Sequence, residues 1–170
     1  EVVSPSIALP SVVTTENKAD MDAAKDFCDY FSRVSDRKIT VSSKLEPQGV
    51  VIHVGRDEFV KKHAPEIEKL FADGYIVRAV KADDRYHIIL AGKIYPSAQW
   101  AIEQFLKDYC GVRWLFPDPV YGEIVPSKPT ITVDQNLSKK YEPDYLSRGN
   151  LSMYYFNPAH TLLRLRAYGH

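Results

Sequence analysis

The chain has 170 residues, of which 45% are hydrophobic, and its 22 Lys and Arg residues balance its 22 Asp and Glu residues. This length fits one domain with a tail, and the apolar share is sufficient for a buried core. Nucleic-acid binding rests largely on phosphate neutralisation and membrane-surface binding on basic clusters, and a chain of zero net charge offers neither. No apolar run approaches the roughly 20 residues that span a bilayer, so the sequence predicts neither a nucleic-acid nor a membrane partner.

Apolar spacing indicates the first strands and the first long helix. Strands are predicted at residues 6–13, 38–42 and 49–54. The last of these is a β-branched run, which is typical of a central strand buried on both faces. Between the first two strands, apolar residues recur at helical spacing over residues 21–34, and Asp20 is the expected N-cap.

The middle of the chain predicts two short helical turns and then a β-hairpin. Asp57 is expected to cap a helix through Lys62, and a further turn or two is expected over residues 65–71. Apolar residues then predict strands over 75–81 and 86–91. The four residues that connect them include no Gly, so the type of turn stays open.

The second long helix is expected to begin at Ser97 and to end near Tyr109, with Gly111 at the position of a C-cap. Three further strands are predicted at residues 112–116, 123–125 and 130–133. The polar segment 134–144 has the composition of a linker. The order of elements predicts an α/β (α+β) fold in which two longer helices pack on a mixed β-sheet.

Motifs that carry catalytic or metal chemistry are missing. Glycosidic hydrolysis needs two facing carboxylates, and seven acidic residues in helical or loop segments are expected to be solvated surface acids instead. These acids are Glu66, Glu68, Asp83, Asp84, Glu103, Asp118 and Glu123. No phosphate loop, nucleophile elbow or zinc-ligand spacing is present, so the sequence predicts no catalytic residue, no metal and no cofactor.

Two histidines and two cysteines are expected to have structural roles. His53 and His87 fall within predicted strands and are expected to be satisfied core or surface residues. Cys28 and Cys110 have apolar neighbours and are expected to be buried free thiols, although a single disulfide between them stays open.

The most distinctive part of the sequence runs from Gly92 to Pro126. It includes Phe105-Leu followed by Gly111-Val-Arg-Trp and later by Gly122-Glu-Ile-Val-Pro. With Ile-Ala-Leu-Pro near the start and the later strands, the pattern resembles the N-terminal domain of family 67 α-glucuronidases and related bacterial proteins. That fold is in turn similar to the domain that precedes the barrel in family 20 β-hexosaminidases. The resemblance covers roughly residues 6–135, and Cys110 stands where the family has Leu.

The resemblance implies an organisation in three parts. Residues 1–135 are expected to form a non-catalytic accessory α/β domain, 136–144 a linker, and 145–170 the start of a catalytic barrel. A barrel needs about 250 residues, so the chain is expected to be a fragment. In such families the catalytic acids come from the barrel, and the accessory domain packs on the barrel and supports it. A periplasmic or extracellular location is expected for such a hydrolase.

The same resemblance implies a role for four residues. Gly111 is expected to supply a left-handed turn, and Arg113 and Trp114 are expected to be structural or interface residues. Arg148, after the linker, is expected to contact sugar, because the guanidinium fork can hold two hydroxyl or carboxylate oxygens.

Two other functions stay open. The chain has 11 Tyr and 2 Trp residues, and their faces suit a carbohydrate-binding module that takes up an oligosaccharide. Alternatively, an exposed apolar surface suits a protein-interaction domain without sugar binding.

Overall fold

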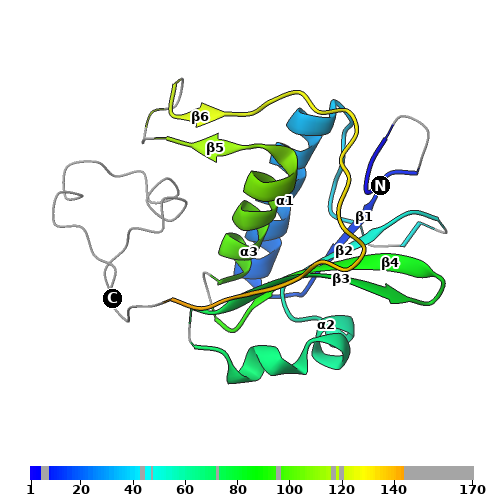
Figure 1. The fold of residues 1–170 in the computed structure, drawn as a ribbon, viewed down its shortest axis with the longest axis vertical. Helices are drawn as coiled ribbons and strands as arrows, with labels where there is room; N and C mark the ends of the chain where they lie inside the picture. The colour runs from blue at the N-terminus through cyan, green and yellow to red at the C-terminus, as the bar shows by residue number, and fades with distance from the viewer. Residues whose placement is uncertain are drawn as a thin grey trace, which may run out of the picture.

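The computed structural model describes residues 1–4, 8–42, 45–46, 48–71, 73–94, 97–115, 118 and 121–143. In chain order the elements are β1 (Ser11–Thr14), α1 (Lys18–Ser35), β2 (Val51–Val54), α2 (Glu58–His63), the 3-10 helix η1 (Pro65–Lys69), β3 (Tyr75–Ala82), β4 (Arg85–Gly92), α3 (Ser97–Phe105), the π-helical turn η2 (Leu106–Cys110), β5 (Arg113–Trp114), β6 (Glu123–Ile124) and β7 (Ser138–Tyr141). Helices α1 and α3 cover one face of the main sheet, whereas α2 and η1 lie on the other (Figure 1).

The main sheet has five strands in the order β1-β2-β4-β3-β7. Strands β1, β2 and β4 run parallel, and β3 is antiparallel to both β4 and β7. The expected α+β fold with a mixed sheet and two main helices is therefore confirmed. All four residues of β2 are buried and the strand has a neighbour on each side, as its β-branched run predicts.

Side chains alternate between the two faces of the sheet and build two apolar layers. The larger layer lies under α1 and α3 and receives Ile52, Val54, Val77, Ile88 and Leu90 from the strands. The smaller layer lies under α2 and η1 and receives Ile76, Ile89 and Ala91, with partly buried Val80 beside them. Burial of one large aliphatic side chain contributes about 1.5–3 kcal/mol, so the larger layer supplies most of the stability.

Helix α1 begins three residues earlier than the apolar spacing predicts. Its N-cap is Asn17, whose side-chain oxygen accepts a hydrogen bond of 2.8 Å from the amide of Ala19. The expectation of Asp20 as N-cap is wrong, because Asp20 lies in the first turn and accepts a bond of 2.6 Å from Thr15 Oγ1. Polar residues precede the apolar stripe over several positions, and spacing alone does not choose among them. Of the helices in the described ranges, none is long and apolar enough to cross a bilayer.

Three segments differ from the expected strands. Residues 38–42 and 130–133 form only single bridges, which pair Val41 with Val12 and Ile131 with Val3. Conversely, part of the expected linker is a strand, since β7 pairs antiparallel with β3. Its sequence Ser-Lys-Lys-Tyr is mostly exposed, and such polar edge strands carry no apolar signal. Residues 145–170, where a barrel is expected to start, lie outside the described residues.

Both cysteines are buried free thiols, as expected. Burial raises the pKa of Cys28 to about 12 and that of Cys110 to about 12. Because the thiolate is the reactive form, neither side chain is a nucleophile near neutral pH.

The β3–β4 hairpin closes more tightly than predicted. Only Asp83 and Asp84 lie between the strands, with φ angles of 48° and 60°. Two left-handed residues in a two-residue connection form a type I′ turn, whose twist matches that of the strands. Asp tolerates this conformation better than most residues other than Asn and Gly, which explains a turn without glycine.

We expect Asp84→Gly to raise the free energy of unfolding by about 1 kcal/mol, because glycine adopts a positive φ without steric cost. Urea denaturation of the wild type and the variant measures the difference. The matched control is Asp84→Val, whose branched side chain is strained at φ 60° and should lower stability. A glycine variant less stable than the wild type would contradict this account of the turn.

Candidate interaction surface

The two-stranded ribbon of β5 and β6 lies at the far end of α1 and α3 from the main sheet (Figure 1). Arg113 pairs with Ile124, and Trp114 pairs with Glu123. Paired residues share one face of an antiparallel ribbon, and successive residues alternate. The pair of Trp114 and Glu123 therefore forms an inner face toward α1, and the pair of Arg113 and Ile124 forms an outer face.

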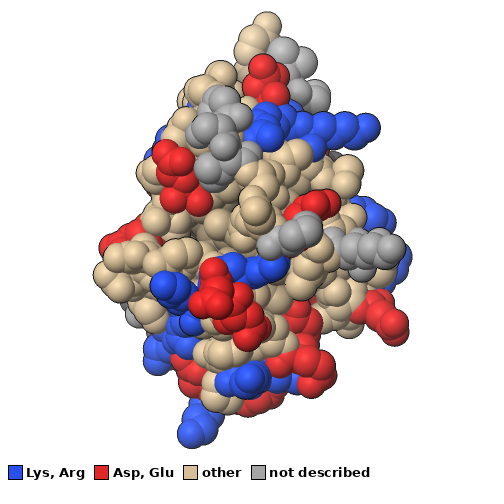
Figure 2. Space-filling view, turned by 90° about the vertical axis from the view of Figure 1, so that its right-hand side faces the viewer, with Lys and Arg blue, Asp and Glu red and all other residues tan. Residues whose placement is uncertain are grey.

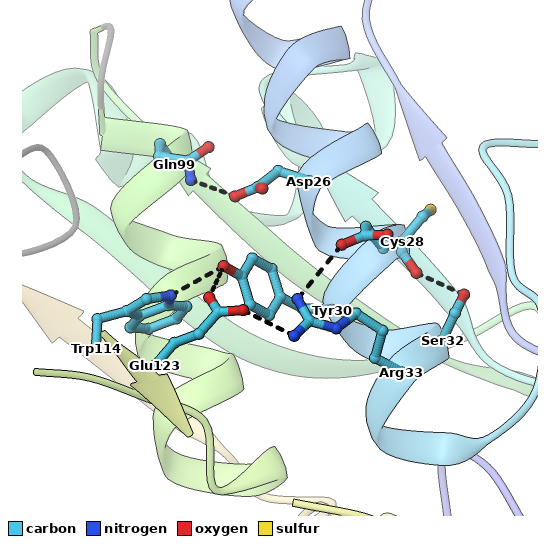
Figure 3. Close-up of polar contacts among 9 residues, drawn as sticks. Asp26, Cys28, Tyr30, Ser32, Arg33, Gln99, Trp114 and Glu123 are labelled. Atoms are coloured by element: carbon cyan, nitrogen blue, oxygen red, sulfur yellow. Dashed lines mark hydrogen bonds and ion pairs between the residues drawn. The ribbon is translucent and has the colours of Figure 1, made fainter. Parts of the chain in front are cut away.

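A polar strip on α1 receives the inner face of the ribbon. Asp26, Tyr30 and Arg33 recur at helical spacing and lie along one side of the helix. Figure 3 shows Gln99 of α3 reaching Asp26, while the ribbon's Trp114 and Glu123 reach the other two. The strip thus links α1 to α3 and to the ribbon, both of which are distant from it in sequence.

Tyr30 is the centre of this network and its side chain is almost completely buried. Its hydroxyl donates to Glu123 and accepts a bond of 3.2 Å from the indole Nε1 of Trp114. The two rings also meet edge to face, with centroids 5.4 Å apart and an interplanar angle of 79°. Charge-assisted hydrogen bonds gain strength where water is excluded, so these contacts fix the ribbon firmly to α1.

Arg33 completes the network from the solvent side. Its Nη2 lies 2.7 Å from Glu123 Oε1, and its guanidinium lies 5.1 Å from the centroid of the Tyr30 ring. Burial acts to lower the pKa of Arg33, but the hydrogen bond and the charge of Glu123 outweigh it and raise the pKa above its ordinary value. A second ion pair joins Arg33 to Asp29 at 3.7 Å and is largely exposed.

Two carboxylates meet at Gln99. Its Nε2 donates to Asp26 Oδ2 at 2.8 Å and to Glu103 Oε1 at 2.9 Å, which uses both amide hydrogens. Glu103 is only 2% exposed, so the expectation of a solvated surface acid is wrong for this residue. The buried side chain of Glu103 is closed to solvent, so this pair does not provide the facing acids that act on a glycosidic bond.

The segment of the ribbon exposes three large apolar side chains. Leu115 and Ile124 are each 51% exposed and Tyr121 is 75% exposed, within a segment of the chain that also forms the inner network. An exposed group of large apolar side chains rimmed by polar residues is characteristic of a protein–protein contact. We refer to Leu115, Tyr121 and Ile124 as the ribbon patch.

The residues that the sequence singles out lie at the base of the ribbon. Gly111 has φ 81° and ends η2, and a Cβ there would lie 3.1 Å from Cγ of Pro126. Arg113 is exposed and folds back, so that its Nη1 donates to the carbonyls of Lys107 at 2.7 Å and of Val112 at 2.8 Å. An interface role for Arg113 and Trp114 stays a prediction. Arg148 lies outside the described residues.

Sequence patterns did not identify Tyr30 or Arg33, and the expectation of Glu123 as a solvated surface acid is wrong, because its half-buried carboxylate binds both of them. A signal exists, since Asp26, Tyr30 and Arg33 form a polar line along an otherwise apolar helix, but the residues that bind this line follow about 90 positions later. Among the described residues, no three His, Cys, Asp or Glu side chains gather in a way that suits a metal ion.

No protein-family model matches the chain, and no curated protein matches its sequence significantly. A solved structure with a similar fold is a family GH115 4-O-methyl-α-glucuronidase, BtGH115A, described as specific for decorated arabinogalactans. The TM-score is 0.57 at 14% identity, over 97% of this chain and 24% of that enzyme. At this identity the likeness establishes the fold alone. The fold thus occurs within a glycoside hydrolase, and the chain spans about a quarter of that enzyme's length.

We expect Tyr30→Phe and Glu123→Gln each to lower the free energy of unfolding by about 1–2 kcal/mol, because the first removes the hydroxyl that donates to Glu123 and the second replaces the charged acceptor with a neutral amide. The double variant should cost less than the sum, with a coupling of about 0.5 kcal/mol or more. Urea denaturation of the four proteins measures this cycle.

Asp29→Asn is the matched control, because it removes the exposed ion pair at 3.7 Å from the same Arg33. It should change stability by less than about 0.5 kcal/mol. Additive effects of Tyr30→Phe and Glu123→Gln would contradict the claim that the two side chains act as one unit.

Proposed function

We propose that this chain is a non-catalytic accessory α/β domain of a carbohydrate-degrading protein, and that it acts by packing the ribbon patch against a further domain of that protein. The observation that carries the proposal is the construction of the ribbon. Its inner face is fixed to α1 by the Tyr30–Glu123–Arg33 network, and Leu115, Tyr121 and Ile124 of the same segment are exposed to solvent. A rigid, exposed apolar surface is suited to packing against a partner.

The fold comparison supports a role in carbohydrate degradation and a partner domain larger than this chain. A glycoside hydrolase includes this fold over about a quarter of its length, so the remaining three quarters are available to a partner domain. Asp26 and Glu103, two carboxylates that share a partner, are both engaged by Gln99. This agrees with an accessory domain whose acids stabilise its fold, while the catalytic acids come from the further domain.

A narrower assignment is part of the proposal. The run from Gly92 to Pro126 supports a relation to the N-terminal domain of family 67 α-glucuronidases and the corresponding domain of family 20 β-hexosaminidases. The partner is then a catalytic barrel, Arg148 contacts the sugar, and the protein is periplasmic or extracellular. Gly111 and Arg113 serve this function by setting the path of the chain into the ribbon.

The docking is testable in the complete gene product that includes this chain. We expect Ile124→Asp to uncouple the accessory domain, because docking buries this side chain and burial of an Ile contributes about 1.5–3 kcal/mol. In calorimetric melting, the accessory domain of the wild type should unfold several degrees above the isolated chain. The variant should lose that difference, while the same substitution in the isolated chain changes little.

Met21→Asp is the control, since Met21 is also an exposed large hydrophobic residue but lies at the start of α1, away from the ribbon. It should leave the coupled transition unchanged. Equal effects of the two substitutions would contradict the choice of surface. A gene product without a further domain, or hydrolysis of aryl glycosides by the isolated chain that is lost on mutating one of its own acids, would overturn the proposed function.

A second candidate, a carbohydrate-binding module, is favoured by a pocket of about 220 Å³ beside the β3–β4 hairpin. Its lining combines the aromatic ring of Tyr86 with the polar side chains of Asp134 and Gln135, and the Tyr86 hydroxyl donates to Gln135 Oε1 at 2.9 Å. Aromatic, carboxylate and amide groups together suit a sugar ring.

Calorimetry of the isolated chain separates the two candidates. For an accessory domain we expect no heat of binding with glucuronic-acid or hexosamine oligosaccharides. Saturable heat that is abolished by Tyr86→Ala, and kept by Ile124→Asp, would instead establish the binding module.

A further inference from the structure

Two histidines meet under α2 although they come from different strands. The β2–β4 register pairs His53 with Ile89 and His87 with Val51, so the two histidines are diagonal neighbours on one face of the sheet. His53 Nε2 lies 2.9 Å from His87 Nδ1, and His53 Nδ1 lies 2.5 Å from Asp57 Oδ2. Both rings are about 95% buried. The result is a buried hydrogen-bond chain from Asp57 through His53 to His87.

This chain fixes the N-terminal end of α2 to the sheet. Asp57 is the N-cap of α2, and its Oδ1 accepts a bond of 2.8 Å from the amide of Val60 while its Oδ2 pairs with His53. Phe59 of α2 stacks on both imidazoles, with centroid distances of 4.4 Å to His53 and 4.1 Å to His87. The first turn of the helix therefore rests on the two rings, while Val60 packs on the small aliphatic layer beside them.

The geometry limits how many protons the two rings can hold. In the neutral chain, His53 Nδ1–H donates to Asp57 and His87 Nδ1–H donates to His53 Nε2. One added proton is accommodated, because His53 then becomes the cation of an ion pair with Asp57 and donates to His87. A second proton places hydrogens on both nitrogens of a 2.9 Å contact and sets two buried positive charges side by side.

The surroundings of the rings do not relieve this repulsion. Nε2 of His87 has no hydrogen-bond partner among the described residues, although the nearby carbonyl of Ala82 favours a protonated ring. The charged groups near the hydrogen-bond chain include Arg56 and Glu68, Arg78 and Glu66, His63 of α2, and Asp83 and Arg85 of the hairpin. The first four form ion pairs with each other, so their net charge is zero. Glu58 and Lys61 of α2 form a further, exposed ion pair, and α2, η1 and β3 also include Lys62, Lys69 and Lys81. Figure 2 shows acidic and basic side chains intermixed toward this lower end of the molecule.

The proton affinities follow the geometry. Burial first, and then the charge of His53, lower the pKa of His87 from 6.5 to about 4. Burial acts to raise the pKa of Asp57, but hydrogen bonds from His53 and from the amide of Val60 hold it below its ordinary value, so Asp57 stays ionised. Because the packed state binds the His87 proton more weakly than the opened state, its stability is present above pH 6.5 and is lost between pH 6.5 and about 4.

We propose that the Asp57–His53–His87 chain is a proton-sensitive latch, which holds α2 on the sheet while its two imidazoles carry at most one proton and releases α2 when they carry two. Release exposes the small apolar layer formed by Ile76, Ile89 and Ala91. The larger layer on the opposite face shares none of these side chains, so α1 and α3 stay in place.

Hydrogen exchange of the whole chain tests the latch. The amides of Lys61 and Ala64 report on α2, since they donate to the carbonyls of Asp57 and Val60 within it. After correction for the intrinsic exchange rate, their opening constant should rise up to about tenfold for each pH unit between pH 6 and 4.5. The opening should be insensitive to low urea, and the amides of α1 should stay more protected throughout.

Two substitutions identify the titrating group. His87→Gln keeps an acceptor for His53 but does not titrate, so the pH dependence of α2 opening should vanish. His63→Gln is the control, because His63 stacks on Phe59 at 4.3 Å outside the hydrogen-bond chain, and the dependence should persist. A pH-independent wild type, an unchanged slope in His87→Gln, a lost slope in His63→Gln, or α2 exchange only with α1 would each overturn the latch.

The wild type alone also decides the question if His87→Gln does not fold. Nitrogen-15 spectra of the imidazoles follow proton uptake at His53 and His87 directly. The second uptake should share its midpoint with α2 opening. Two rings that are both protonated while α2 stays protected would refute the proposal.

Discussion

Strands β2 and β4 are buried on both faces. The need to cover both faces determines where the other elements lie. Backbone and apolar groups on each face need a cover, and the chain supplies covers of unequal size. The cover of α1 and α3 brings a layer of aromatic and aliphatic side chains, including Phe27, Phe31 and Phe105, whose rings lie 5.1–6.5 Å apart. The cover of α2 and η1 is short, so the sheet beneath it is finished with imidazoles and a capping carboxylate in place of a full apolar layer.

Helix α1 serves two layers because its faces differ. Phe27 and Phe31 point to the sheet and to α3, whereas Tyr30 and Arg33 point to the ribbon. The aromatic contacts fix the rotation of the helix about its axis, and that rotation in turn fixes where the polar strip lies. The ribbon therefore takes its position from the packing of the core, even though its own two strands are too short to form a stable unit.

The sequence was informative where the signal is local. The β-branched run of β2, the capping role of Asp57 and the left-handed turn at Gly111 depend on neighbouring residues, and the structure confirms each of them. Strand β7 was missed, because an exposed edge strand needs no apolar residue. The burial of Glu103 was missed as well, since α3 is buried nearly all round and its polar face meets α1.

The polar networks could not be predicted because they depend on strand order and register. His53 and His87 are 34 residues apart, and they meet only because β4 lies next to β2 with a particular offset. Tyr30 and Glu123 are 93 residues apart and meet only because the ribbon crosses the end of α1. A pattern of spacing indicates which face of an element is buried, but it contains no information on which element covers that face.

The two networks lie on opposite sides of the sheet, and this separation has a functional consequence. The Tyr30 network connects α1, β5 and β6, whereas the His53 chain connects β2, β4 and α2, and no side chain belongs to both. Energetic coupling between distant groups requires a shared element with two discrete arrangements, and the central strands, packed on both faces, are the part of the fold least able to supply one. Changes in the protonation of His53 and His87 under α2 should therefore leave the ribbon patch in place at any pH at which the larger layer stays folded.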